Sequence, residues 1–531
     1  MARRVERRSF SWLTLTTALL VGTVMSAPVR AQTVPLTFGA IPPDDVVSLP
    51  EGGIDRALAD LPAAVESVMK RSGVPGVAVA VVHGGKTVFA RGFGVRELGK
   101  EAAIDTATVF QIASMSKPIA ATIAATQVTA GKVNWDDPVV KHLPGFAVAD
   151  AYVTANGTIG DYFSHRSGLP HAAGDTLEDI GFDRDTILQR LRMLPLVAFR
   201  TSFNYSNFGF TTAAEAVAAA AGTPWHELAQ QALYRPLGMK STSSLYADFL
   251  KRDNRATLHA LVDGRFVARY QRDPDQQSPA GGVTSNVVDL AAWVKLLLAN
   301  GTQDGQTLIA PAAMLPALRP QAFSSPARTI AGRSGFYGFG FNVSVNADGR
   351  PAMSHSGAFT TGAATNVQMV PSADIGIIVL TNAGPVGAAE AIAGHFLDIV
   401  LFGEVTRDWY AVMHPLLMQY YNPEGDLVGQ TAPAAPKPAR PLADYVGTYE
   451  SAYFGPATIS LGEGGLVLTL GPAAVAMKMT HWDGDVFSIA PRSENAPWGS
   501  LSSVRFEGPG GKPTSVRVDY LDDEGLALWT R

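Results

Sequence analysis

The chain has 531 residues, of which 47% are hydrophobic and 17% charged, as is typical of a globular protein long enough for more than one domain. Its formal net charge of −5 gives no indication of a nucleic-acid partner, and we expect none. Cysteine is absent, which excludes disulfides, a thiol nucleophile and thiolate metal ligands. The 10 histidines show no metal-ligand spacing, so we expect neither a metal nor an organic cofactor.

Residues 1–31 predict an export signal. A basic start is followed by a short apolar run from Leu13 to Met25, and Val29-Arg30-Ala31 offers a cleavage site between small residues. Arg7-Arg8-Ser9-Phe10 resembles a twin-arginine signal; an ordinary secretory signal or an uncleaved anchor are the alternatives. We expect a periplasmic or secreted protein that has no membrane span once the signal is removed.

The next part of the chain predicts an α+β domain over residues 53–428, preceded by a Pro-rich tether at residues 32–52. Helices are predicted at residues 54–72, 114–133, 211–221, 287–298 and 388–402. Strands are predicted at residues 77–82, 87–91, 367–370 and 375–380, paired as two hairpins. Since strands at both ends flank a helical middle, we expect an antiparallel sheet that joins early and late segments, with a helical subdomain beside it.

A second domain is predicted after a change of composition. Residues 429–441 are rich in Pro and Ala, which is typical of a semi-rigid linker. Residues 442–531 form short alternating runs with Gly-rich turns, and the clearest strands lie at residues 457–461, 466–470, 486–489, 504–506 and 515–520. We interpret this region as a separate, small all-β barrel.

The first candidate for chemistry is Ser114-Met115-Ser116-Lys117, at the start of a predicted helix. Residues three apart lie on the same face of a helix, so Ser114 and Lys117 should be neighbours. A serine hydroxyl becomes a nucleophile when a base takes its proton, and a lysine can be that base if desolvation lowers its pKa. Serine and lysine are common, so this motif alone is weak evidence.

Two further motifs follow in order. Tyr205-Ser206-Asn207 offers a phenol that can relay a proton and an amide that can hold a substrate. In His355-Ser356-Gly357, the glycine beside an edge strand would let a substrate backbone approach. Taken alone, the first is more often a polar turn with a packed tyrosine, and the second a turn with a surface histidine.

Together the three motifs resemble the serine beta-lactamase and penicillin-binding-protein-like hydrolases, nearest the class C and esterase/D-aminopeptidase branch. Three more segments support the resemblance over residues 53–400: Phe163–Pro170, Arg235–Met239 and Pro279–Val283. From Tyr445 onward, the β region looks like the lipocalin-like domain that some members append.

The resemblance implies roles for these residues. Ser114 would be the acylated nucleophile, activated by Lys117. Tyr205 would carry a proton to the leaving group and later help to activate water. Asn207 would position Lys117 and the substrate amide.

The resemblance also implies an oxyanion hole and an electrostatic partner. The backbone N–H groups of Ser114 and Ala358 would hold the oxyanion. His355 stands where many members carry lysine, and would act as a weaker, pH-dependent electrostatic partner. We interpret His165 and Arg166, by contrast, as structural residues.

The function predicted is therefore an exported serine hydrolase acting on a small molecule or short peptide. A peptidase or amidase, on peptides with D- or unusual residues among others, ranks level with a carboxylesterase. Beta-lactamase ranks third because His355 replaces a lysine that helps to bind a substrate carboxylate. A receptor that acylates without turnover is the alternative from another class. The β domain would be an interaction module or a cover for the cleft, and the oligomeric state is left open.

Overall fold

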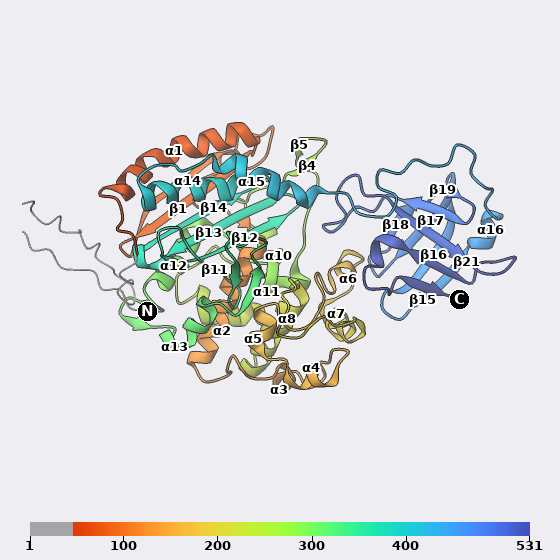
Figure 1. Cartoon of the computed structure of the whole chain (residues 1–531), viewed down its shortest axis with the longest axis horizontal. Coiled ribbons are helices and arrows are strands. Elements are labelled where there is room, and N and C mark those ends of the chain that lie inside the picture. Colours follow the sequence, from red (N-terminus) through yellow and green to blue (C-terminus); the bar gives the residue numbers. More distant parts are fainter. Residues whose placement is uncertain (1–45) are drawn as a thin grey trace, which may run out of the picture.

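The computed structural model describes residues 46–531. The predicted export signal and residues 32–45 of the predicted tether lie outside the described residues. Figure 1 shows a larger body of mixed helices and strands and a smaller β body at the C-terminal end. Across residues 46–531 we find no helix with the length and apolar character needed to cross a bilayer.

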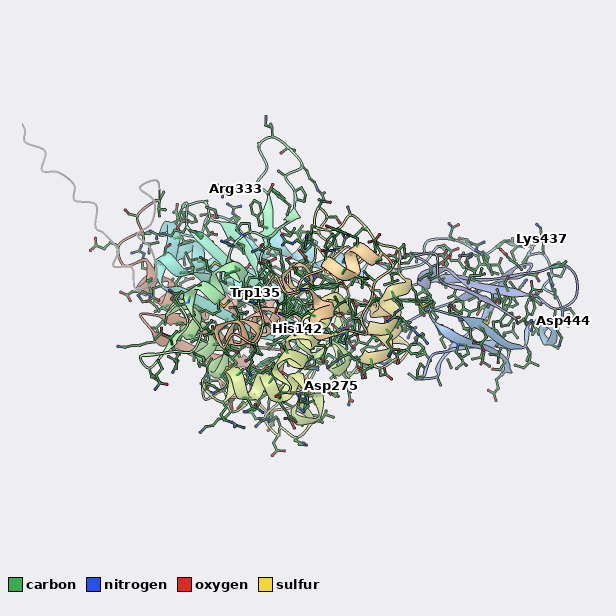
Figure 2. The ribbon with its side chains drawn as sticks, turned by 90° about the horizontal axis from the view of Figure 1, so that it is seen from below. Trp135, His142, Asp275, Arg333, Lys437 and Asp444 are labelled. Atoms are coloured by element: carbon green, nitrogen blue, oxygen red, sulfur yellow. The ribbon has the colours of Figure 1, made fainter. Side chains whose placement is uncertain are left out.

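The larger body is built on an eight-stranded antiparallel sheet whose order joins early and late segments, as predicted. In spatial order its strands are β2 (Lys86–Gly94), β1 (Gly76–His83), β14 (Ile375–Thr381), β13 (Ala363–Val370), β12 (Pro351–Phe359), β11 (Asn342–Val345), β10 (Gly335–Tyr337) and β9 (Ala322–Ser325). Both predicted hairpins are present. In Figure 2 the connection between β9 and β10, which carries Arg333, projects from the body.

Helices cover both faces of this sheet because the central strands are apolar on both sides. In β1, the odd-numbered residues from Val77 to Val81 pack with α1 (Gly53–Ser72) and α14 (Ala388–Phe402). The even-numbered residues from Ala78 to Val82 join the other core, which includes α12 (Val287–Leu298). This second core extends into the helical subdomain, so the predicted catalytic residues lie between the sheet and that subdomain.

The helical subdomain lies below the sheet in Figure 1. Its helices are α2 (Ser116–Thr129), α3 (Val139–His142), α4 (Ala151–Asn156), α5 (Ile159–Phe163), α6 (Asp175–Asp179), α7 (Arg184–Arg190), α8 (Asn207–Ala221), α9 (Trp225–Ala229), α10 (Tyr246–Leu250) and α11 (Ser278–Gly281). The sequence predicted all of α2, with extra residues at both ends, and α8 from Thr211 onward. It did not predict the short helices, which have too few turns for a periodic pattern.

The C-terminal body is a nine-stranded antiparallel sheet that curls into a nearly closed barrel. Its strands are β15 (Gly447–Ser451), β16 (Gly455–Gly462), β17 (Gly465–Leu470), β18 (Val475–Lys478), β19 (Thr480–Asp483), β20 (Val486–Ile489), β21 (Ser502–Glu507), β22 (Ser515–Val518) and β23 (Leu528–Thr530). Buried aromatic side chains fill it, and Trp529 among them donates to the Gly455 carbonyl at 2.8 Å. The predicted all-β domain is therefore present.

The connection between the bodies, predicted as a semi-rigid linker at residues 429–441, is hydrogen-bonded to the barrel. Asp426 already belongs to the barrel, since its carboxylate accepts from Ser503 N–H at 2.8 Å. Within the predicted linker, Lys437 N–H donates to Asp483 at 2.7 Å and Arg440 pairs with Asp485 at 3.0 Å. These polar anchors fix the segment to the barrel surface. Lys437 lies on the C-terminal body in Figure 2.

Candidate active site

Ser114 lies on a strained turn that precedes the long helix. The 3-10 turn η1 (Ala113–Met115) comes first, and α2 begins at Ser116, two residues later than predicted. Ala113 has a φ of +47°, which is unfavourable for a residue with a side chain. The hydroxyl of Ser116 fixes the turn, donating to Ala113 O at 2.7 Å and accepting from Val283 N–H at 2.9 Å. Ser114 is thereby left partly exposed on a cavity wall.

Lys117 is fully buried, and its amine meets three oxygen atoms. Nζ lies 3.1 Å from Ser114 Oγ, 2.7 Å from Asn207 Oδ1 and 3.0 Å from Ala280 O. Two of the sequence motifs, and the Pro279–Val283 segment, therefore converge on one nitrogen atom. The burial lowers the pKa of Lys117 to about 7, against the opposing effect of Asp175. A lysine with this pKa is substantially neutral near pH 7, as a general base must be.

Tyr205 faces the same pair of residues. It precedes α8, which is capped by the Ser206 hydroxyl accepting from Gly209 N–H at 3.0 Å. Lys117 Nζ lies 4.5 Å from the centroid of the Tyr205 ring. Burial raises the pKa of Tyr205, and the hydrogen bond with Ser114 opposes the rise. Tyr205 is therefore a neutral phenol whose O–H is available for proton transfer.

His165 supports Tyr205 from behind, in the structural role that was predicted. Its ring lies 4.4 Å from the Tyr205 ring, and its Nδ1 accepts from Ser206 N–H at 3.2 Å. Arg166 likewise serves the fold, since it pairs with the buried carboxylate of Asp161 at 2.8 Å.

The edge of β12 approaches the nucleophile. Pairing with β11 stops at Ser354, so the later residues of β12 have no strand partner on that side. A Cβ on Gly357 would lie 2.1 Å from Ile112 O and 3.0 Å from Met115 N, so only glycine allows this approach. The turn that carries Ser114 therefore packs against Gly357, and the approach of a substrate backbone to this edge of β12 stays a prediction. Ala358, the predicted oxyanion donor, lines the cavity with Ser114.

His355 lies in β12, but not as a titrating cation. Its Nδ1 donates to Ser356 O at 2.6 Å, and its Nε2 accepts from the Tyr337 hydroxyl at 2.9 Å. Burial, with a contribution from nearby Lys117, lowers the pKa of His355 to about 3. The prediction of a pH-dependent electrostatic partner is therefore wrong near neutral pH: His355 is a neutral, hydrogen-bonded group.

These residues surround a cavity of about 530 Å³. Its lining includes Ser114, Tyr205, Asn207, His355 and Ala358, so the structure brings together five of the predicted site residues. The other two predicted residues do not line the cavity: Lys117 is buried behind its wall, and Gly357 is packed inside that wall.

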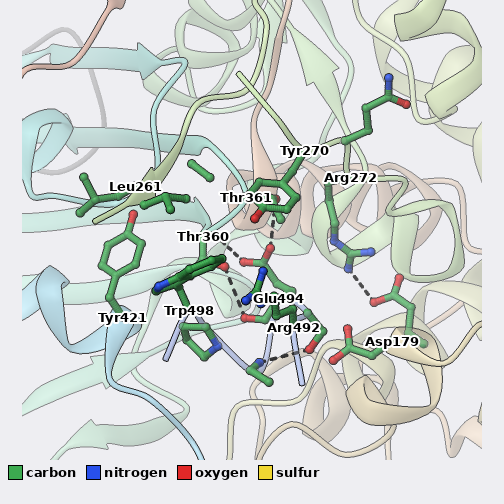
Figure 3. Close-up of a pocket in the computed structure, with 17 residues that line it drawn as sticks. Asp179, Leu261, Tyr270, Arg272, Thr360, Thr361, Tyr421, Arg492, Glu494 and Trp498 are labelled. Atoms are coloured by element: carbon green, nitrogen blue, oxygen red, sulfur yellow. Dashed lines mark hydrogen bonds and ion pairs between the residues drawn. The ribbon is translucent and has the colours of Figure 1, made fainter. Parts of the chain in front are cut away.

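The C-terminal body supplies part of the same cavity, through Glu494 and Asn495. Glu494 accepts from Thr360 N–H at 2.5 Å and from the Thr361 hydroxyl at 3.1 Å, at the turn that follows β12 (Figure 3). Asn495 donates to Asp179 of α6 at 2.9 Å. The β domain is therefore a wall of the cavity, as one of the two alternatives predicted.

Sequence reasoning missed several of the polar residues of the site. Asp175, Arg272, Tyr337 and Glu494 line the cavity, but they lie in loops, short helices or a short strand outside the three motifs. Arg272 pairs with Glu178 at 2.6 Å, which neutralises it. Within residues 46–531, no group of three or more His, Asp or Glu side chains is arranged to hold a metal ion.

Comparison with known proteins agrees with this geometry. The family described as "Beta-lactamase" matches residues 61–400, more than half of the chain, and a domain of unknown function, DUF3471, matches residues 431–528. The chain therefore belongs to the beta-lactamase family, whose serine hydrolases include D-alanyl-D-alanine carboxypeptidases.

Two relatives and one solved structure illustrate the proteins to which this chain is similar. Penicillin-binding protein 4 of Amycolatopsis lactamdurans is 28% identical over 71% of this chain and 93% of its own. The D-alanyl-D-alanine-carboxypeptidase/endopeptidase AmpH of Escherichia coli is 25% identical over 62% of this chain and 85% of its own. The octameric penicillin-binding protein homologue from Pyrococcus abyssi is 18% identical, with a TM-score of 0.56 over 89% of this chain and 99% of its own. That last likeness concerns the fold.

Proposed function

We propose that this protein is an exported serine hydrolase that cleaves amide or ester bonds through an acyl-enzyme on Ser114. The observation that carries the proposal is the buried Lys117 amine held 3.1 Å from Ser114 Oγ by two other oxygen atoms. Export rests on the pattern of residues 1–31.

The first half of the reaction forms the acyl-enzyme. Ser114 Oγ attacks the carbonyl carbon, and its proton passes to Lys117 Nζ. The carbonyl oxygen becomes an oxyanion, stabilised by the backbone N–H groups of Ser114 and Ala358. The bond to the leaving group then breaks, and that group takes a proton relayed from Lys117 through the Tyr205 hydroxyl.

The second half releases the product. A water molecule attacks the acyl carbon and gives its proton to the same Lys117–Tyr205 relay. The bond to Ser114 Oγ breaks, Ser114 regains a proton and the carboxylic acid leaves. Because Tyr205 is neutral, it acts by passing its O–H proton on as it receives another.

The cavity favours a small substrate. A volume of about 530 Å³, closed on one side by Glu494 and Asn495, suits a short peptide or a small ester. Among the described residues that line it, Arg272 is the one permanent cation, and Glu178 already engages it. His355 is neutral, so a substrate carboxylate finds no free positive charge. This ranks a peptidase or amidase level with a carboxylesterase, and both ahead of a beta-lactamase.

The test compares the full-length protein with Ser114→Ala on four substrates. These are a short-chain nitrophenyl ester, a D- and an L-amino-acid anilide, and a chromogenic cephalosporin. Turnover of any one that Ser114→Ala abolishes supports the proposal and ranks the substrate classes. Equal turnover by Ser114→Ala contradicts it. A Ser114 adduct that persists for hours without turnover would instead indicate a receptor that acylates and stalls.

A further inference from the structure

Asp175 lies behind Lys117, the proposed base, and Asn207 is hydrogen-bonded to both residues. It is the first residue of α6 and is 6% exposed. One carboxyl oxygen, Oδ2, accepts from Asn207 Nδ2 at 3.0 Å, and the other has no hydrogen-bond partner. Asp175 also lines the catalytic cavity, although none of the sequence motifs contains it.

The Asn207 side chain has two unlike ends. Its amide oxygen accepts hydrogen bonds, whereas its amide nitrogen donates them. Because Asp175 Oδ2 is an acceptor, the nitrogen end turns toward Asp175 and the oxygen end toward Lys117. The reverse orientation would place two acceptors against each other in a buried site, which is unfavourable.

The orientation matters because a neutral lysine amine has two N–H bonds and one lone pair. Asn207 Oδ1 and Ala280 O can only accept, so they take the two N–H bonds of Lys117. The lone pair then points at the third neighbour, Ser114 Oγ. An Asn207 side chain turned the other way would offer N–H groups to Lys117 and compete for that lone pair.

We propose that Asp175 is a positioning residue, which fixes the Asn207 amide so that the lone pair of Lys117 faces the Ser114 hydroxyl. The inference rests on the proposed acyl-enzyme function and adds to it the residue that orients the base. Asp175 acts only through Asn207, so its effect should vanish when Asn207 is removed.

The local fold holds Asp175 in this place. Gly174 has a φ of +89°, and a Cβ there would lie 2.7 Å from Ile187 and 3.1 Å from Phe208. This close approach lets the start of α6 reach Asn207. A hydrogen bond from Ala172 N–H to Tyr205 O at 2.9 Å ties the same loop to the second motif.

The positioning does not require a particular charge on Asp175. Burial raises its pKa well above the usual value; Glu178 and Asp179 of α6 add to the rise, and Lys117 opposes it. Tyr205 and Tyr453, the latter from the C-terminal body, also face it. Charged or protonated, the carboxyl group keeps an oxygen that accepts from Asn207. An asparagine at this position should therefore serve as well.

The experiment measures acylation of Ser114 by a fluorophosphonate probe, and kcat and KM on nitrophenyl acetate, in full-length variants. Asp175→Ala is expected to lower kcat and the acylation rate about 10- to 100-fold, with KM within about twofold. Asp175→Asn is expected to stay within about threefold of wild type. In the Asn207→Ala background, Asp175→Ala should not lower kcat or the acylation rate any further.

Two controls separate positioning from folding. Asp185→Ala, in the first turn of the neighbouring helix α7, removes an exposed carboxylate outside the cavity lining and should leave kcat unchanged. Asp175→Leu keeps the branching of aspartate at Cγ without an accepting oxygen, and it repeats the test if Asp175→Ala unfolds. Thermal unfolding midpoints are recorded for every variant.

Wild-type kcat in Asp175→Ala overturns the inference, as does an undiminished further loss in the Asn207→Ala background. So does an Asp175→Asn protein that is as slow as Asp175→Ala. A wild-type protein that the probe never acylates at Ser114 would instead overturn the proposed function itself.

Discussion

The two walls of the catalytic cavity are built in different ways. One wall holds Ser114, and Lys117, three residues later in the chain, lies behind it at a distance of 3.1 Å. The other holds Glu494, which reaches Thr360 across 134 residues and from a separate body. The first wall contains the proposed reacting atoms, whereas the second shapes and closes the space around them. Loss of the first should abolish the chemistry, and loss of the second should only weaken it.

The largest effect is expected from Ser114→Ala. Without the nucleophile no acyl-enzyme forms, so kcat should fall by roughly 10⁴-fold or more. Steady-state hydrolysis of the best substrate measures this, and an unchanged thermal midpoint shows that the variant folds. Residual activity near the wild-type level would mean that the first wall does not perform the chemistry.

The pH dependence should report Lys117 and not His355. Lys117 acts as a base only when neutral, so with its pKa near 7, kcat/KM on an ester should be roughly tenfold lower at pH 6 than at pH 8. His355, with a pKa of about 3, stays neutral throughout this range. Its replacement in His355→Asn should lower the rate without moving the midpoint. A midpoint that disappears in His355→Asn would reverse the assignment.

A smaller effect is expected at the second wall. Glu494→Ala removes the acceptor of Thr360 N–H, two residues beyond the predicted oxyanion donor Ala358, and leaves that N–H unsatisfied. A loss of about 1–2 kcal/mol would lower kcat roughly 5- to 30-fold. Glu494→Gln keeps an accepting oxygen and should recover most of the rate.

The matched control is Glu463→Ala, at the turn between β16 and β17 of the same body, away from the cavity lining. Deletion of residues 430–531 extends the comparison, since an open cavity should admit larger substrates. Unchanged selectivity after the deletion would show that the second wall does not limit substrate size.

The smallest effect concerns the contact between the bodies. Arg190 of α7 lies 4.1 Å over the Phe182 ring and donates to the Tyr453 carbonyl of the barrel. Arg190→Ala should lower the unfolding midpoint of the larger body by about 1 °C, for a loss near 1 kcal/mol. Calorimetry measures this. Arg192→Ala is the control, because Arg192 donates to the Gln189 and Gly145 carbonyls of the larger body. Equal shifts in the two variants would show that the interface contact adds no stability.

The sequence predicted the larger elements well because their signals are local. The helix from Gly53 to Ser72 and the hairpin around Gly84-Gly85 follow from periodicity and turn residues. For α2, the predicted helix begins two residues too early and ends four residues too late, since the observed helix stops at Thr129. The Ser116 hydroxyl sets its start by donating to Ala113 O and accepting from Val283 N–H, and Val283 is remote in the chain.

Of the site, the sequence by itself indicated the proposed reacting groups, because Ser114, Lys117 and Tyr205 belong to short motifs with definite chemistry. Only the tertiary structure decided their state. Burial makes Lys117 a base and keeps His355 neutral, because the pKa of each depends on the solvent that distant segments exclude. Packing also placed the turn that carries Ser114 against Gly357. It brought Asp175 and Glu494 to the cavity. Contacts between residues far apart in the chain leave no local pattern in the sequence.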